Sequence, residues 1–171
     1  MLMVHDRRTV HYDLIGPDDA PVVCFAHALA ADGGMWAEQI PAVLAAGFRA
    51  LRIDMRGHGG SAAAPGDYTL FGLADDIVAV LDACGIAQVH VVGLSVGAMI
   101  GEALGLAHGG RVRSLTLCEA PPKALHNAAA VWGPRVAAVR AAGSCAPIAD
   151  ATLARWLTPA FTRRCRSSRP R

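Results

Sequence analysis

The chain has 171 residues, 53% of them hydrophobic and 18% charged, which fits a globular protein with a core and excludes a disordered chain. No apolar run reaches the length of a membrane span and the first residues lack a signal-like apolar stretch, so we expect a cytoplasmic protein without membrane contacts. The formal net charge of +2 hides an uneven distribution, because residues 163–171 contain five of the 16 basic side chains. Residues 1–162 hold 11 basic and 14 acidic side chains, which argues against nucleic-acid binding.

The five cysteines include no Cys-x-x-Cys pair. Cys24 and Cys118 fall within apolar runs that we interpret as strands, where free cysteine packs as a small hydrophobe. We therefore expect reduced, structural cysteines, and we predict neither a metal site nor a cofactor.

Strand and helix patterns alternate along the first 118 residues. Strands are predicted at 2–6, 8–16, 21–27, 48–54, 88–94 and 112–118, the first two joined by a tight turn at 6–8. Helices are predicted at 36–46, 69–84 and 96–108, the second with Thr69 as N-cap and Gly85 at its end. Strands that alternate with helices at this spacing predict an α/β fold with a mostly parallel, doubly wound sheet.

The pattern changes after residue 122. Residues 131–143 and 146–161 have helical patterns with no strand between them, and we interpret these two helices as a lid over the ends of the strands.

Polar side chains occur where the predicted strands end. His27, Asp54, Ser95 and Glu119 each lie at such a position, one on each of four strands. In sheets of this kind the reactive site lies at the carboxyl ends of the strands, so this set is typical of an active site.

Ser95 lies between Gly93 and Gly97, where a predicted strand turns directly into a predicted helix. A G-x-S-x-G sequence in that context is typical of a nucleophile elbow, in which a strained turn exposes the serine and needs small neighbours. The Val96 N–H would then lie at the start of the helix, where it favours an oxyanion. The alternative is that the glycines only let helix and strand pack closely. A dinucleotide-binding loop is disfavoured because it needs glycine at position 95.

Three segments, GLSVGAM from Gly93, DMRGHGGS from Asp54 and AHALAADGGMW from Ala26, resemble the α/β-hydrolase superfamily. Within this superfamily, residues 4–161 resemble the 3-oxoadipate enol-lactonases. The lid segment around Trp132 and Arg135 is what points to the lactonases among the members of the superfamily. The resemblance implies an α/β-hydrolase fold. The N-terminal part of the α/β-hydrolase core would span residues 1–120. A partial helical lid would span 121–161, and a divergent basic tail would span 162–171.

The resemblance implies that Ser95 is the nucleophile and that the backbone N–H groups of Val96 and Leu29 form the oxyanion hole. It implies a structural role for His27. Arg56 and His58 are interpreted in the same way, as residues of the loop architecture.

Trp132 and Arg135 could line the substrate pocket. The alternative, a packing tryptophan and a solvated arginine, stays open.

A serine nucleophile needs a base and an orienting acid, and in this family both follow the nucleophile in the chain. The enol-lactonases take them from segments beyond the resemblance. Glu119 is the candidate acid here, with a loop carboxylate as the alternative, and neither His108 nor His126 is a convincing base. We expect a truncation, such as a reading-frame shift, that removes the last strands. The strand at 112–118 would then be an exposed apolar edge that self-associates.

Together these expectations predict a serine hydrolase of the enol-lactonase type, which acts on a small lactone or ester in aromatic catabolism (the β-ketoadipate pathway). Its activity would be impaired by loss of the acid and the histidine. A general carboxylesterase or cofactor-free haloperoxidase-like hydrolase is one alternative. A non-catalytic truncated remnant is the other.

Overall fold

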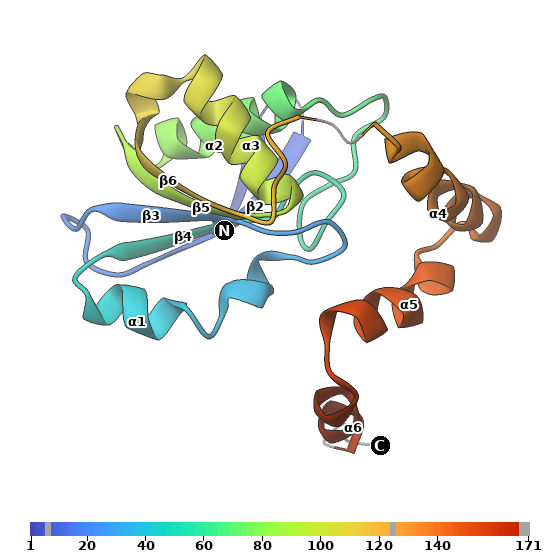
Figure 1. The fold of residues 1–171 in the computed structure, drawn as a ribbon. Helices are drawn as coiled ribbons and strands as arrows, with labels where there is room; N and C mark the ends of the chain where they lie inside the picture. Colours follow the sequence, from blue (N-terminus) through green and yellow to red (C-terminus); the bar gives the residue numbers. More distant parts are fainter. Residues whose placement is uncertain (6–7, 124–125, 168–171) are drawn as a thin grey trace. The chain divides into compact units, whose positions relative to one another are not determined.

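The computed structural model describes residues 1–5, 8–123 and 126–167. The chain divides into two compact units, Met1–Pro122 and Lys123–Arg171 (Figure 1). None of the helices within the described residues is long and apolar enough to cross a membrane.

The first unit contains a six-stranded sheet in the order β1-β2-β4-β3-β5-β6. Its strands are β1 (Leu2–His5), β2 (Arg8–Ile15), β3 (Val22–Ala26), β4 (Arg49–Ile53), β5 (Val89–Leu94) and β6 (Val112–Cys118). The pairs β1–β2 and β2–β4 are antiparallel, whereas β3 pairs in parallel with β4 and β5, and β5 with β6. This confirms the predicted mostly parallel sheet. The tight turn predicted at 6–8 falls mainly on residues outside the described part of the chain.

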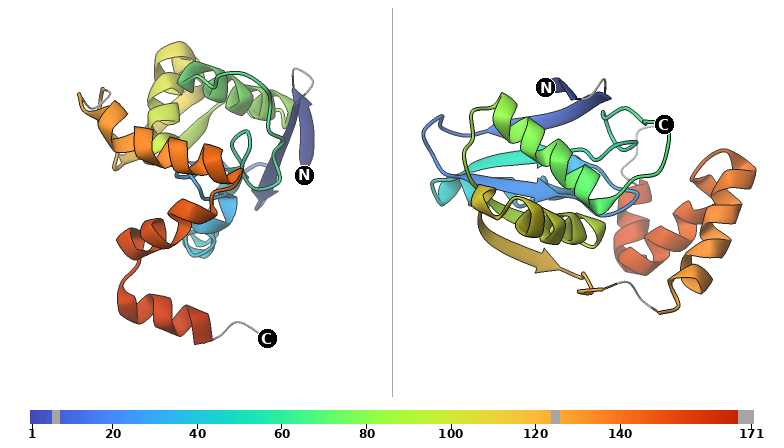
Figure 2. Two further views of the ribbon diagram at one scale, coloured as in Figure 1. Left: turned by 90° about the vertical axis from the view of Figure 1, so that its right-hand side faces the viewer. Right: turned by 90° about the horizontal axis from the view of Figure 1, so that it is seen from above.

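Helices cover both faces of the sheet (Figure 1). Helix α1 (Ile40–Ala45) lies on one face, and α2 (Leu70–Ala83) and α3 (Val96–Ala107) lie together on the other, as Figure 2 also shows from above. All five residues of β3 are buried, and they alternate between the two cores: Cys24 packs in the core under α2 and α3, whereas Phe25 packs with Trp36 on the α1 face. A strand buried on both faces therefore needs a continuous apolar run.

The ends of the helices show where local sequence decides the structure. Thr69 caps α2 as predicted, because its Oγ1 accepts a hydrogen bond from the Gly72 N–H at 3.0 Å. Gly85, at φ +67°, follows the end of the same helix, also as predicted.

The helix predicted at 36–46 is wrong at its start: Trp36 ends a separate 3₁₀ turn, η1 (Gly33–Trp36), and the α-helix begins only at Ile40 with Pro41 in its first turn. The spacing did not separate the two, because turn and helix bury their apolar residues on the same side of the sheet. A second short 3₁₀ turn, η2 (Gly109–Arg111), precedes β6.

In the described residues of the second unit, three helices follow one another without a strand (Figure 2). They are α4 (Ala128–Ala142), α5 (Ala146–Trp156) and α6 (Pro159–Ser167). The single helix predicted at 146–161 is wrong, because the chain is extended at Leu157. Thr158 precedes Pro159, and the proline ring disfavours the helical conformation in the residue before it. The helix therefore stops and a new one starts at the proline.

Candidate active site

Ser95 alone makes the turn between β5, which ends at Leu94, and α3, which begins at Val96. Its backbone has φ 55° and ψ −117°, a conformation that costs a residue with a side chain about 1–3 kcal/mol. The turn is fixed on both sides: the Ser95 N–H donates to the Cys118 carbonyl oxygen at 2.8 Å, and the Ala98 N–H donates to the Ser95 carbonyl at 3.0 Å.

The two glycines around Ser95 have no room for a side chain. A Cβ on Gly93 would lie 2.5 Å from the Gly97 carbonyl oxygen, and a Cβ on Gly97 would lie 2.2 Å from the Ala26 carbonyl oxygen. The start of α3 is therefore pressed against the end of β3. Close packing explains the glycines, but it does not require the positive φ of Ser95, and strained residues of this kind cluster at functional sites.

Two backbone N–H groups that follow the ends of β3 and β5 are available to an anion. Ala26 on β3 is paired with Gly93 on β5, so the segments that follow these neighbouring strands leave the sheet at the same edge. Within the described residues, neither the Leu29 nor the Val96 N–H donates a hydrogen bond. Val96 also starts a twelve-residue helix, whose dipole favours negative charge at that end.

His27 is fully buried, and both of its ring nitrogens are used. Nδ1 donates to the Ala28 carbonyl oxygen at 2.8 Å, and Nε2 accepts the Met55 N–H at 2.9 Å. Burial lowers the pKa of this histidine and so keeps it neutral. A neutral ring bonded on both sides cannot act as a base, which agrees with the predicted structural role.

Asp54 also lies at this edge, but its carboxylate holds loops together. It accepts the Gly33 N–H at 2.7 Å, the Gly60 N–H at 2.9 Å and a bond from His11 Nδ1 at 2.9 Å. Burial disfavours the charged form, but the hydrogen bonds from Gly60, Gly33 and His11 outweigh it, and the pKa of Asp54 is lowered. No pattern in the sequence pointed to His11 as its partner.

Arg56 braces the same loop, as predicted. Its guanidinium donates to Asp76 Oδ1 at 2.8 Å and to the Gly72 carbonyl oxygen at 2.6 Å, both on α2, and the pair of charged side chains is buried.

Glu119 directly follows β6, with an exposed side chain and φ 54°. Because Ser95 bonds the carbonyl of Cys118, Glu119 is the next residue along from that contact. Ala30, Ser95 and Glu119 are the three non-glycine residues with positive φ in the described part of the chain, and each lies just beyond the end of β3, β5 or β6. Backbone strain therefore gathers at one edge of the sheet.

Neither histidine that follows Ser95 in the chain was predicted as its base. His108 follows the last residue of α3, about 20 Å along the helix from Ser95, and pairs with Asp75 at 2.8 Å. His126 is exposed in the second unit. No histidine side chain among those that the structure describes is hydrogen-bonded to Ser95 Oγ.

Trp132 and Arg135 both lie on α4 in the second unit. The Arg135 guanidinium carbon lies 4.9 Å from the centre of the Trp132 ring, which is 41% exposed.

The family model for the alpha/beta hydrolase fold matches residues 21–141, which include the elbow and the loops around it. The chain belongs to the alpha/beta hydrolase fold family.

Three relatives place the chain within this hydrolase family. It is 32% identical to 3-oxoadipate enol-lactonase 1 of Acinetobacter baylyi, over 94% of this chain and 59% of the relative. The crystal structure of an enol-lactonase from Burkholderia xenovorans LB400 is 34% identical with a TM-score of 0.87, over 96% of this chain and 62% of that one. The crystal structure of a hydrolase from Pseudomonas aeruginosa PA01 is 32% identical in sequence, also with a TM-score of 0.87, and the match covers 99% of this chain and 62% of that one. The chain thus spans about three fifths of the length of these relatives.

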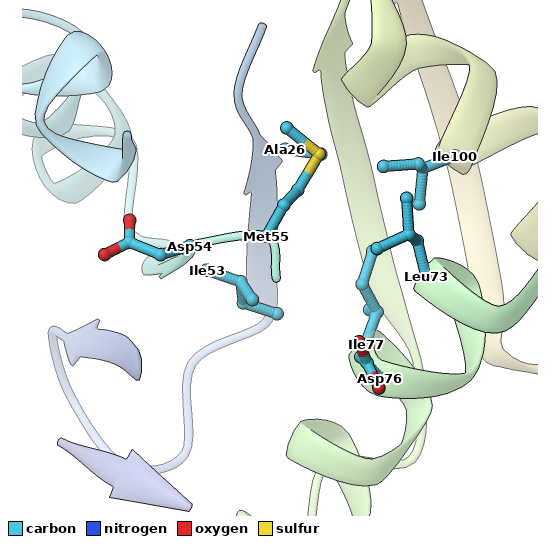
Figure 3. A pocket seen from close by; sticks show the side chains of 8 residues that line it. All are labelled: Ala26, Ile53, Asp54, Met55, Leu73, Asp76, Ile77 and Ile100. Atoms are coloured by element: carbon cyan, nitrogen blue, oxygen red, sulfur yellow. The ribbon is translucent and has the colours of Figure 1, made fainter. Parts of the chain in front are cut away.

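Among the described residues, two cavities of the first unit are lined without Ser95. Figure 3 shows one of about 10 Å³ between β4 and helices α2 and α3; its lining residues are Ala26, Ile53, Asp54, Met55, Leu73, Asp76, Ile77 and Ile100. It has room for about one water molecule and is too small for a substrate. The other, of about 280 Å³, is polar and is lined by His11, Asp13, Asp32, Gly33, Gly34, Arg52, Asp54, Gly59 and Gly60.

Proposed function

We propose that this chain is a serine hydrolase of the enol-lactonase type, in which Ser95 attacks the carbonyl of a small lactone or ester. The observation that carries the proposal is the strained conformation of Ser95 at the junction of β5 and α3. The N–H groups of Val96 and Leu29 follow the ends of β5 and β3 at the same edge of the sheet and donate no hydrogen bond within the described residues. The similarity to proteins named enol-lactonases supports the lactone as substrate class.

The chemistry follows from this arrangement. Ser95 Oγ loses its proton to a base and bonds to the carbonyl carbon, and the carbonyl oxygen becomes an oxyanion. The Val96 and Leu29 N–H groups stabilise this anion, each by about 3 kcal/mol. The ring C–O bond then breaks, the leaving oxygen takes up a proton, and water hydrolyses the resulting acyl-enzyme to release Ser95.

The remaining roles are assigned on chemical grounds. Glu119 is the proposed acid, because its position beside the Ser95 contact suits a carboxylate that orients a protonated base. Trp132 and Arg135 are the proposed substrate contacts, since a guanidinium held on an indole ring can pair with a substrate carboxylate.

The proposal includes impaired turnover. The described histidines of the first unit are bonded elsewhere, so we propose that the reaction of this chain alone is limited by the supply of a base to Ser95. A well-placed general base contributes about 10²–10⁴-fold to such reactions.

Chemical rescue tests the proposal. Hydrolysis of the enol-lactone of 3-oxoadipate and of a p-nitrophenyl ester would be measured for the wild type and Ser95→Ala, with and without added imidazole. We expect slow, Ser95-dependent hydrolysis that imidazole accelerates above the background measured with Ser95→Ala. Preference for the activated ester over the lactone would favour a general carboxylesterase. Equal rates for the two proteins in all conditions would contradict the proposal and favour a non-catalytic chain.

A further inference from the structure

The loop that carries Leu29 forms a tight turn. The Ala31 N–H donates to the Ala28 carbonyl oxygen at 3.2 Å, so Leu29 and Ala30 are the two corner residues. Ala30 has φ 63°, which at the third position of a turn is the signature of type II. Alanine is disfavoured there relative to glycine, so an interaction outside the turn must help to hold it.

His58 supplies that interaction. The Ala30 N–H donates to His58 Nε2 at 3.3 Å, from a loop 28 residues further along the chain. His58 Nδ1 lies 3.0 Å from the Arg56 carbonyl oxygen, which can only accept, so Nδ1 carries the proton and Nε2 is the acceptor. In a type I turn the central peptide would be reversed and its N–H would point away from His58.

The two histidines of this edge form a reciprocal brace. His27, from the loop after β3, accepts the Met55 N–H of the loop after β4, and His58, from the loop after β4, accepts the Ala30 N–H of the loop after β3. Their rings lie 5.2 Å apart between centres. The His58 backbone is itself fixed, because its N–H donates to the Met55 carbonyl oxygen at 2.9 Å.

We propose that His58 is a positioning residue for the oxyanion hole: its ring accepts the Ala30 N–H and so ties the turn that carries the Leu29 N–H to the loop after β4. The catalytic part of this inference rests on the proposed function, because it takes Leu29 as an oxyanion donor. The structural part, the bond from Ala30 to His58, does not depend on it.

Three variants distinguish the effect of the bulk of the His58 ring from the effect of its hydrogen-bond acceptor. His58→Phe keeps a ring against His27 but cannot accept a hydrogen bond, whereas His58→Gln places an amide oxygen near the position of Nε2. His108→Phe is the matched control, because it removes a histidine that is bonded on the surface far from the turn. Fluorescence of the buried Trp36 would check that each variant folds.

The first readout is amide hydrogen exchange at Ala30, which is exposed and therefore owes its protection to this bond. We expect exchange at least about 10-fold faster in His58→Phe, with the wild-type rate largely kept in His58→Gln and in His108→Phe. The second is hydrolysis, where we expect kcat to fall about 10–100-fold in His58→Phe with KM within about two-fold. Unchanged exchange or unchanged kcat in His58→Phe would overturn the inference.

The wild type offers a test that needs no variant. Nitrogen-15 shifts of the His58 ring at neutral pH should show Nδ1 protonated and Nε2 unprotonated, and the opposite tautomer would overturn the inference. Failure of the proposed function would look different: Ser95→Ala would hydrolyse substrate as fast as the wild type while the exchange results held.

Discussion

Replacing Gly97 by alanine tests the packing that creates the elbow. The added Cβ would lie 2.2 Å from the Ala26 carbonyl oxygen and 2.7 Å from that of His27, both backbone atoms that cannot rotate away. A non-bonded contact needs about 3.5 Å, so the start of α3 must move by about 1 Å from β3. Overpacking of this kind costs about 1–3 kcal/mol or more, against which alanine gains about 1 kcal/mol of helix propensity.

We therefore expect Gly97→Ala to lower the free energy of unfolding by about 2 kcal/mol, which corresponds to a Tm lower by about 4–8 °C. Gly109→Ala is the control, because its Cβ would meet nothing within 4 Å. Trp36 is the one tryptophan of residues 1–122, so urea unfolding followed by its fluorescence in a Trp132→Phe, Trp156→Phe background reports on the first unit. Equal unfolding midpoints for the two glycine variants would refute the reasoning.

Three further predictions concern charge and the edge of the sheet. Folding lowers the pKa of Asp54, so the ionised carboxylate stabilises the folded protein at pH values above the pKa of the unfolded chain, and this stabilisation is lost as the pH falls through the pKa of the folded protein. Asp54→Asn should therefore be less stable than the wild type at pH 7. The difference in urea midpoint between the two proteins should close below about pH 4. Arg56→Met leaves Asp76 buried without its cation and should cost about 3–5 kcal/mol in urea unfolding, whereas adding Asp76→Leu should recover most of this loss. Thr116→Lys places a charge on the exposed strand β6 at the end of the sheet and should reduce self-association, and unchanged sedimentation would contradict pairing through that edge.

The sequence was informative where local chemistry decides the structure. The apolar run of β3 predicted a strand, and Thr69 predicted the start of α2, because a helix cap and a buried strand leave local patterns. The helix at 36–46 and the single helix at 146–161 were wrong. In the first, a 3₁₀ turn and a helix share one apolar face; in the second, the restriction that Pro159 places on its neighbour outweighs the helical spacing.

The site was predictable only in part. The residues around Ser95 predicted a strained turn because the glycines and the change of period are adjacent in sequence. The bonds from Met55 to His27 and from Ala30 to His58 join residues 28 positions apart and depend on which ring nitrogen carries the proton, and no sequence pattern records that. The roles of Glu119, Trp132 and Arg135 stay predictions.

Site-specific labelling tests the central claim that Ser95 is the nucleophile. Ser114 is the internal control: its Oγ lies 2.8 Å from His90 Nδ1, so it has a histidine partner but lies in an ordinary strand without an elbow. The protein would be treated with a fluorophosphonate, with imidazole present, and the modified peptide identified by mass spectrometry. The account predicts one phosphonyl group per chain, on Ser95, abolished by Ser95→Ala and kept by Ser114→Ala. An unmodified Ser95, or equal labelling of Ser114, would contradict it.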